Sequence, residues 1–173
     1  MVTERQFIAL PVAVLTISDS RTEDTDTSGH ALVTRLQDAG HLLQDKRILR
    51  DDIYQIRAVV AAWIASPEIS VILTTGGTGV TGRDGTPEAI GVLLDKQLEG
   101  FGEMFRVLSF AQINTSTLQS RALAGVANAT YVFCLPGSPS ACILAWDSLI
   151  SQQLDYRTRP CNLVELMPRL LEK

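Results

Sequence analysis

The segment LTTGGTGVTGRDGTPEA, which runs from Leu73 to Ala89, passes from an apolar run through a glycine-rich loop into the first turn of a helix. Its glycines at positions 77, 79 and 82 match the G-x-G-x-x-G fingerprint of dinucleotide-binding folds, and positions 77 and 82 also frame the G-x-x-x-x-G of a phosphate-binding P-loop. A P-loop continues with lysine and then serine or threonine, whereas this loop continues with Arg83 and Asp84. The segment therefore does not bind phosphate as a P-loop does.

A dinucleotide-binding loop is also disfavoured, because its helix must open at the third glycine for the helix dipole and amides to reach the pyrophosphate. Here Arg83, Asp84 and Gly85 intervene, and Pro87, a residue suited to the first helical position, places the helix start later. The acidic ribose ligand, expected about twenty residues further on at the end of a strand, would fall in a helical stretch at 101–110. The loop is thus a set of backbone donors that also presents a carboxylate.

Asp84 has two interpretations. The amides of residues 76–79 and the hydroxyls of Thr75 and Thr78 could hold a phosphate, and a carboxylate beside a phosphate is repulsive unless a divalent metal ion lies between them. Magnesium is commonly held by one or two carboxylates together with substrate phosphates, which would make Asp84 a magnesium ligand. Alternatively, Asp84 makes an Asx turn ahead of Gly85. The spacing alone does not choose between the two.

Hydrophobic patterns along the rest of the chain predict strands that alternate with helices. Short apolar, β-branched runs predict strands buried on both faces, and stripes of helical periodicity separate them. Strands are expected at 12–17, within 42–49, at 69–75 and at 131–135, with one more before a turn at Asn128; helices are expected at 27–40, at 51–63, from 86, at 101–110 and at 139–154. Thr27 or Ser28, and Thr86, are expected to cap their helices. This alternation predicts an α/β fold with a mostly parallel central sheet covered on both faces.

Four loops are expected to meet at one edge of this sheet, because the carboxyl ends of parallel strands converge there and form the ligand crevice of such folds. They are residues 18–20, residues 51–52, the glycine loop and residues 136–139, all polar or rich in glycine. Two of them have a structural alternative: acids at a helix start complement the helix dipole, and Pro-Gly is common in strand-to-helix turns. Their shared topological position is what indicates a ligand site.

Composition limits the class of function. With 173 residues and 46% hydrophobic content, the chain can bury one good core, and we expect a single domain (1–173) with a core at about 12–157 and a less regular tail at 158–173. A net charge of −4 argues against a nucleic-acid partner, which needs a basic face. A zinc or iron–sulfur site is disfavoured, because the three cysteines (134, 142 and 161) have no C-x-x-C spacing and the only histidines are His30 and His41. The same cysteines favour a reduced cytoplasmic protein. No segment reaches the length of a membrane span, so no membrane partner is expected.

Several separated motifs resemble one known family. TTGGTG, RDGTPEAI and LPGSPSA are similar to motifs of the MogA/MoaB family of molybdenum-cofactor biosynthesis proteins, and VLTISDS and DTSGHAL resemble that family's first strand and loop. EGFGEMFRVLSF, TSTLQSRALAGVAN and RTRPCN look most like the MoaB branch. The motifs occur in the family's order, and the resemblance covers nearly the whole chain, from Val12 to Asn162.

The resemblance implies a three-layer α/β/α fold that binds molybdopterin, a pterin bearing a dithiolene and a terminal phosphate. It also implies that active members adenylylate that phosphate with magnesium ATP, giving adenylyl-molybdopterin and pyrophosphate. The family's two acids match Asp51 and Asp84, as catalytic residues and as magnesium ligands. The family usually has proline where this chain has Arg50, which leaves the choice between Asp51 and Asp52 open. Some MoaB-type relatives replace the Arg-Asp pair that this chain keeps at positions 83 and 84, and its retention favours activity.

The resemblance also implies a binding surface and partners. The residues implied in nucleotide or pterin binding are Ser18, Asp19, Thr75, Gly76, Gly77, Thr78, Gly79, Ser116, Pro136, Gly137 and Ser138. Arg121, near Ser116, could pair with a phosphate or form only a surface salt bridge. The implied partners are molybdopterin and ATP, further molybdenum-cofactor biosynthesis proteins, and copies of the chain itself in a homotrimer or a dimer of trimers. For such an assembly the sequence adds only apolar residues that exceed what one small core needs, such as Phe101, Phe105, Phe110 and Trp146. The alternative function is a non-catalytic carrier that holds molybdopterin while another protein adenylylates it.

Overall fold

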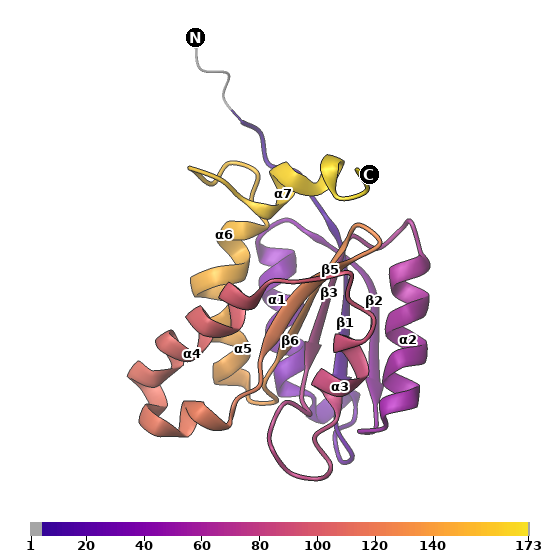
Figure 1. Ribbon diagram of the computed structural model, residues 1–173, viewed down its shortest axis with the longest axis vertical. Helices are drawn as coiled ribbons and strands as arrows, with labels where there is room; N and C mark the ends of the chain where they lie inside the picture. The colour runs from indigo at the N-terminus through magenta and orange to yellow at the C-terminus, as the bar shows by residue number, and fades with distance from the viewer. Residues whose placement is uncertain (1–4, 173) are drawn as a thin grey trace.

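The computed structural model describes residues 5–172, which form one six-stranded sheet with helices on both faces (Figure 1). The strands are β1 (Pro11–Ile17), β2 (Leu42–Leu49), β3 (Val71–Thr75), β4 (Lys96–Gln97), β5 (Leu123–Ala127) and β6 (Thr130–Leu135). They lie in the order β2-β1-β3-β6-β5-β4. β1 pairs in parallel with β2 and β3, and β3 pairs in parallel with β6, whereas β5 runs antiparallel to both of its neighbours. The predicted mostly parallel sheet is confirmed, with β5 running against the others.

Helices cover both faces of the sheet. One face carries α1 (Thr27–Asp38), α4 (Glu99–Ile113) and α5 (Pro139–Ala145), and α5 continues through a π-helical turn at Trp146–Ile150 into α6 (Ser151–Gln153). The opposite face carries α2 (Ile53–Ala65) and α3 (Thr86–Gly91). Figure 1 shows α2 and α3 on one side of the sheet and α4, α5 and α6 on the other. The three-layer α/β/α fold implied by the family resemblance is therefore present.

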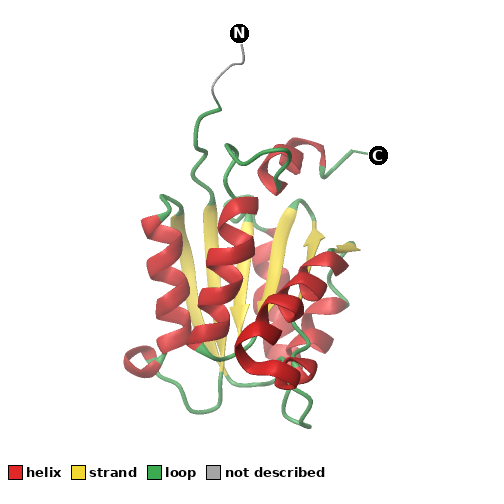
Figure 2. Ribbon diagram, turned by 90° about the vertical axis from the view of Figure 1, so that its left-hand side faces the viewer, coloured by secondary structure: helices red, strands yellow, loops and turns green. Residues whose placement is uncertain are grey.

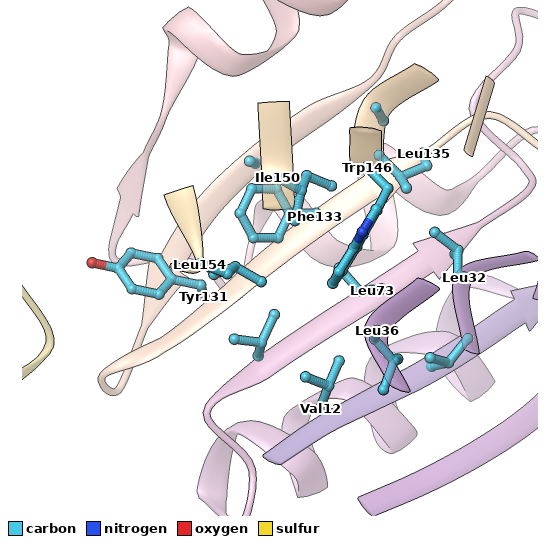
Figure 3. Close-up of a cluster of buried hydrophobic side chains, with 14 of the residues drawn as sticks. Val12, Leu32, Leu36, Leu73, Tyr131, Phe133, Leu135, Trp146, Ile150 and Leu154 are labelled. Carbon is cyan, nitrogen blue, oxygen red and sulfur yellow. The ribbon is translucent and has the colours of Figure 1, made fainter. Parts of the chain in front are cut away.

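Two hydrophobic clusters, one on each face, hold the layers together. Residues of β1 alternate between them, because Val12 and Val14 belong to the cluster of α1 and α5 whereas Ala13 and Leu15 belong to that of α2. Figure 3 shows side chains of the first cluster, among them Leu32, Leu36, Leu73, Phe133 and Trp146. Strands buried on both faces have continuous apolar sequences, which is why the sequence revealed them. Burial of each large side chain contributes about 1.5–3 kcal/mol.

The predicted helix caps were wrong at two positions. Asp26, not Thr27 or Ser28, caps α1: its fully buried carboxylate accepts a hydrogen bond of 2.9 Å from the Gly29 amide. Thr86 is the first residue of α3 rather than its cap, and its hydroxyl donates to the Gly76 carbonyl at 2.8 Å. Sequence favours several Ser, Thr and Asp residues equally at a helix start, so tertiary partners decide which one is used.

Two further elements differ from the sequence prediction. β3 begins at Val71 rather than at residue 69, and β4, which was not predicted, is a pair of polar residues. β4 forms because the backbone on either side of it bonds to β5: the Asp95 amide donates to the Val126 carbonyl and the Leu98 amide to the Ala124 carbonyl, both at 2.8 Å. Pairing with β5 therefore determines the strand conformation of β4, whose own sequence has no alternation of apolar residues.

The tail packs against the end of the sheet opposite the carboxyl ends of the parallel strands (Figure 2). It contains α7 (Leu163–Leu166), capped by Asn162, and a 3₁₀ turn at Met167–Arg169. Arg5 ties the N-terminal segment to this tail through its hydrogen bonds to Glu165, of 3.2 and 2.5 Å. Over residues 5–172, none of the helices combines the length and apolar character that crossing a membrane requires.

Candidate functional site

The loops that follow β1, β3 and β6 open into a crevice of about 470 Å³ at the carboxyl ends of these strands. α4 and the 3₁₀ helix η2 (Asn114–Gln119) form its far wall. Of the residues implied in nucleotide or pterin binding, all except Asp19 line this crevice: Ser18, Thr75, Gly76, Gly77, Thr78, Gly79, Ser116, Pro136, Gly137 and Ser138. Asp84 also lines it, whereas Asp51 and Asp52, from the fourth loop expected there, do not. Segments more than 100 residues apart in the chain, from Ser18 to Ser138, thus share one cavity.

The far wall contains residues that the sequence analysis did not assign to the site. Phe105 and Ser109 face the crevice from α4, and Gln119 and Ser120 face it from the end of η2. Ser109 is 5% exposed, and it lies on the buried stripe of α4 one turn beyond Phe105. A serine on the buried stripe of an amphipathic helix was the signal available in the sequence, but it becomes informative only once α4 is known to face the crevice.

The backbone of the glycine loop requires its first two glycines. Gly76 and Gly77 have φ angles of 104° and 65°, in the left-handed region that glycine tolerates best. A Cβ at Gly76 would lie 2.1 Å from the Ile17 carbonyl oxygen, and a Cβ at Gly77 would lie 2.3 Å from Thr86 Oγ1 and 2.7 Å from Asp51 Oδ2. The loop therefore packs directly against β1, α3 and the turn before α2.

Some of the expected phosphate donors are used within the protein. The Gly76 amide donates to the Leu135 carbonyl at 3.0 Å, and the Thr75 hydroxyl donates to the Pro136 carbonyl at 2.8 Å. These two groups therefore shape the crevice wall and are not free donors, contrary to expectation. Within residues 5–172, the amides of Gly77 and Thr78 donate no hydrogen bond, so they are the donors that the loop can offer to an anion.

The Asp84 carboxylate turns back toward its own loop. Its Oδ2 accepts from the Thr81 amide at 2.8 Å and from the Thr81 hydroxyl at 2.6 Å, so it does not form the alternative Asx turn ahead of Gly85. The Thr81 hydroxyl bond, with smaller contributions from the Thr81 and Gly79 amides, lowers the pKa of Asp84 below its usual value. Asp84 is accordingly ionised at neutral pH.

Asp51 approaches the same loop from the turn before α2. Its Oδ1 accepts from the Gly85 amide at 3.3 Å, and its Oδ2 lies beside Gly77. Burial raises the pKa of Asp51, and the negative charge of Asp84 raises it further. Asp52 instead caps α2 by accepting from the amides of Tyr54 and Gln55, both at 2.9 Å. Asp51 is thus the member of the pair that faces the glycine loop.

Asp19 lies at the rim of the crevice and binds Arg83. The Arg83 guanidinium donates to both Asp19 oxygens at 2.6 Å, and the Asp51 amide donates to Asp19 at 3.3 Å. The bond from Arg83 lowers the pKa of Asp19. The pair is exposed, so it joins the first loop to the glycine loop across the rim without being a strong contribution to stability.

The cysteines and histidines lie outside this chemistry. Burial raises the pKa of Cys134 to about 12 and that of Cys142 to about 11, so both remain thiols. His41 is buried, with its Nδ1 accepting from the Leu10 amide at 3.2 Å, and His30 lies near Glu23 on the surface. In the described part of the chain, no group of three or more His, Cys, Asp or Glu residues is placed to hold a metal ion. Two carboxylates, such as those of Asp51 and Asp84, would therefore not complete a cation site without oxygens from a ligand.

Comparison with known proteins identifies the family. Residues 13–156 match the family described as "Probable molybdopterin binding domain". The chain belongs to this family. It is 56% identical to molybdenum cofactor biosynthesis protein B of Escherichia coli (strain K12) over 157 residues, which are 91% of this chain and 92% of that protein.

Solved structures of the family share the fold. A crystal structure of a molybdenum cofactor biosynthesis protein B matches with a TM-score of 0.84 and 42% identity, covering 87% of this chain and 94% of the other. The tungsten cofactor synthesizing protein MoaB of Pyrococcus furiosus matches with a TM-score of 0.74 and 34% identity, covering 83% and 92%. The resemblance to the MoaB branch, first noted in separated motifs, is confirmed.

Proposed function

We propose that this protein acts in molybdenum cofactor biosynthesis as a molybdopterin adenylyltransferase, with Asp51 and Asp84 as catalytic residues and magnesium ligands. The observation that carries the proposal is that Asp84 lines a crevice of backbone amides and hydroxyls, while Asp51 lies against Gly77 and Gly85 of the same glycine loop. Family membership supports the substrate class, because the matched family is described as molybdopterin binding and the similar proteins are named for molybdenum or tungsten cofactor synthesis.

The two carboxylates fit a magnesium ion. Magnesium prefers oxygen ligands and is commonly bound by one or two carboxylates together with substrate phosphates. Asp84 is held ionised by its hydrogen bonds. Among residues 5–172, the Asp51 side chain accepts one hydrogen bond, on Oδ1, which leaves Oδ2 available as a ligand. When bound, magnesium would offset the charge of the ATP phosphates and of the leaving pyrophosphate.

The proposed reaction joins two polyanions. An oxygen of the molybdopterin phosphate attacks the α-phosphorus of ATP, the bond from that phosphorus to the bridging oxygen breaks, and pyrophosphate leaves with its electron pair. The attacking phosphate is already ionised, so no side chain has to remove a proton, in keeping with two histidines that lie outside the crevice. The chain itself positions the reactants: the Gly77 and Thr78 amides donate to phosphate oxygens, and the Ser18 hydroxyl, which follows the neighbouring strand β1 and also lines the crevice, can donate to a second group.

Pyrophosphate release tests the proposal. The purified protein is incubated with molybdopterin, ATP and magnesium, and its rate is compared with that of Asp84→Asn and of Asp52→Asn, a matched variant of an acid assigned only to helix capping. We expect magnesium-dependent release that falls about 100-fold or more in Asp84→Asn and stays near wild type in Asp52→Asn. Tight molybdopterin binding by the wild type without release would instead indicate the carrier.

A homotrimer or a dimer of trimers is proposed on the same family grounds, and the structure changes the residues assigned to it. Phe105 and Trp146 are 1% and 3% exposed, so they belong to the chain's own core and were wrongly counted as excess apolar surface. Among the exposed apolar side chains, four lie along α4: Met104, Val107, Ile113 and Phe110, of which Phe110 was among those expected. Exposed apolar residues that gather on one helix are candidates for an interface. Light scattering tests the assembly, and a folded monomer would contradict it. Other molybdenum-cofactor biosynthesis proteins are proposed as partners on family grounds alone.

A further inference from the structure

Arg121, which lies just before β5, joins three separate parts of the candidate site. Its Nε donates to the Gly79 carbonyl at 2.7 Å, its Nη2 donates to the Asp84 carbonyl at 2.9 Å, and its Nη1 pairs with the Glu88 carboxylate on α3. The Arg121 backbone amide also donates to the Thr78 carbonyl at 3.0 Å. Of the alternatives open from the sequence, the salt bridge is present, but two of the three side-chain contacts are to backbone carbonyls.

These contacts close a turn that has few other anchors. From Gly79 to Asp84 the chain forms neither helix nor strand, and the hydrogen bonds between Asp84 and Thr81 are internal to this turn. Internal bonds fix the shape of the turn but not its position relative to the sheet. The Arg121 guanidinium binds both ends of the turn, whereas the other side-chain link to the rest of the protein is the exposed pair of Arg83 with Asp19.

We propose that Arg121 is the positioning residue that holds the 79–84 turn, and with it the Asp84 carboxylate, in place for the adenylyl transfer proposed above. The inference rests on that proposed function for its catalytic meaning. Arg121 does not touch the crevice itself; it acts through Asp84 and through the loop amides. Gln119 and Ser120, the two residues before it, do line the crevice, so the same segment links the far wall to the glycine loop.

The chemistry of the guanidinium explains why arginine stands at this position. A guanidinium presents five N–H donors in a rigid planar fork, so three of its nitrogens reach three differently placed acceptors at once. A lysine ammonium could keep the ion pair with Glu88, but as a compact point charge it would not span the Gly79 and Asp84 carbonyls. The charge of Arg121 also adds to the hydrogen bonds from Thr81 and Gly79 in lowering the pKa of Asp84.

Four variants of the full-length chain test the inference. Arg121→Met removes the fork, Arg121→Lys keeps only the charge, and Glu88→Gln keeps the two carbonyl contacts while removing the ion pair. Arg169→Met is the control, because it removes one positive charge from an exposed pair with Glu172 in the tail. Three quantities are measured: the magnesium dependence of pyrophosphate release, the binding of magnesium ATP by calorimetry, and hydrogen exchange of the 76–85 amides.

We expect Arg121→Met and Arg121→Lys to raise the magnesium concentration for half-maximal rate about tenfold, as expected for the loss of charge-assisted hydrogen bonds. The KM for molybdopterin should change less than twofold, and exchange of the 76–85 amides should accelerate. Glu88→Gln should have a small effect and Arg169→Met none. If Arg121→Lys had the magnesium dependence and the amide exchange of the wild type, the ion pair with Glu88 would be sufficient and the inference would be overturned.

The proposed function and the inference fail separately. If the wild-type protein binds magnesium ATP but releases no pyrophosphate, adenylylation is wrong, and binding by the Arg121 variants decides the positioning role. If the wild type does not bind magnesium ATP, the proposed function is wrong, and hydrogen exchange of the 76–85 amides still decides whether Arg121 holds the turn. If exchange of the 76–85 amides in Arg121→Met equals that in Arg169→Met, Arg121 does not hold the turn, whatever the activity.

Discussion

Replacing Gly77 by alanine is expected to damage both the stability and the metal site, because one methyl group would disturb the loop in two ways. Gly77 has a φ of 65°, and the left-handed conformation costs a residue with a Cβ roughly 1–2 kcal/mol. The new Cβ would lie 2.3 Å from Thr86 Oγ1, which must move away and so weaken its 2.8 Å bond to the Gly76 carbonyl, at a cost of about 1 kcal/mol. The expected loss in the free energy of unfolding is therefore about 2–3 kcal/mol.

The control lies in the same loop. A Cβ at Gly82 would meet no atom within 4 Å, and its φ lies outside the left-handed region. Gly82→Ala should leave stability unchanged or raise it by about 0.4–1 kcal/mol, by restricting the unfolded chain. Urea denaturation gives the unfolding midpoint of each variant, and the difference in midpoint reports the difference in stability when the m-values are equal. Equal midpoints for Gly77→Ala and Gly82→Ala would refute the assignment of strain to Gly77.

The same pair of variants separates stability from function. In Gly77→Ala the methyl would also lie 2.7 Å from Asp51 Oδ2 and push this carboxylate away from the loop. We expect the magnesium concentration for half-maximal pyrophosphate release to rise in Gly77→Ala but not in Gly82→Ala. Unchanged magnesium dependence in a destabilised Gly77→Ala would mean that Asp51 is not a ligand.

Three further outcomes follow from neighbouring acids. Asp52→Ala should cost about 1 kcal/mol of stability through the lost cap, seen as a lower urea midpoint, with the rate of pyrophosphate release kept. Because the pKa of Asp51 is raised, its protonation as pH falls through that pKa stabilises the fold but removes a proposed magnesium ligand. Magnesium affinity should therefore fall at a pH where Asp84, with its lowered pKa, is still ionised. Calorimetry of Asp51→Asn should not show this pH dependence. Asp26→Ala should cost about 2–3 kcal/mol, because the buried carboxylate accepts from the Thr16 hydroxyl at 2.8 Å and from the Gly29 amide; a thermal or urea midpoint equal to that of the wild type would contradict this.

The order of elements could be predicted because each strand of the parallel core carries its own signal. For example, the strands Val71–Thr75 and Thr130–Leu135 are buried along their whole length, and their apolar sequences predict this burial. The same periodicity located α4 within a few residues at each end. β4 carries no such signal, because its two residues are exposed and join the sheet only through the backbone of β5.

The candidate site could be predicted only in part, because topology places loops but does not assign their hydrogen bonds. The convergence of the loops after β1, β3 and β6 followed from the rule that ligands bind at the carboxyl ends of parallel strands, whereas residues 51–52 contact the glycine loop without lining the crevice. The use of the Thr75 hydroxyl did not, since its acceptor, the Pro136 carbonyl, lies 61 residues away in the sequence. Likewise, Asp51 and Asp52 are equivalent in the sequence, and only the start of α2 shows that one caps the helix while the other faces the glycine loop.

The proposed function would place a divalent cation at Asp51 and Asp84, because within residues 5–172 neither carboxylate forms a salt bridge with an arginine, although Arg21 lines the crevice. Arg83 already neutralises Asp19, and Arg121 is engaged by two carbonyls and Glu88. Within residues 5–172, no side-chain cation forms a salt bridge with Asp51, whose pKa is raised by burial and by the charge of Asp84. Two phosphate-bearing substrates would add further negative charge beside these carboxylates. Since a divalent ion is attracted to both carboxylates and phosphates, its binding would turn this repulsion into attraction where the proposed reaction brings the phosphates together.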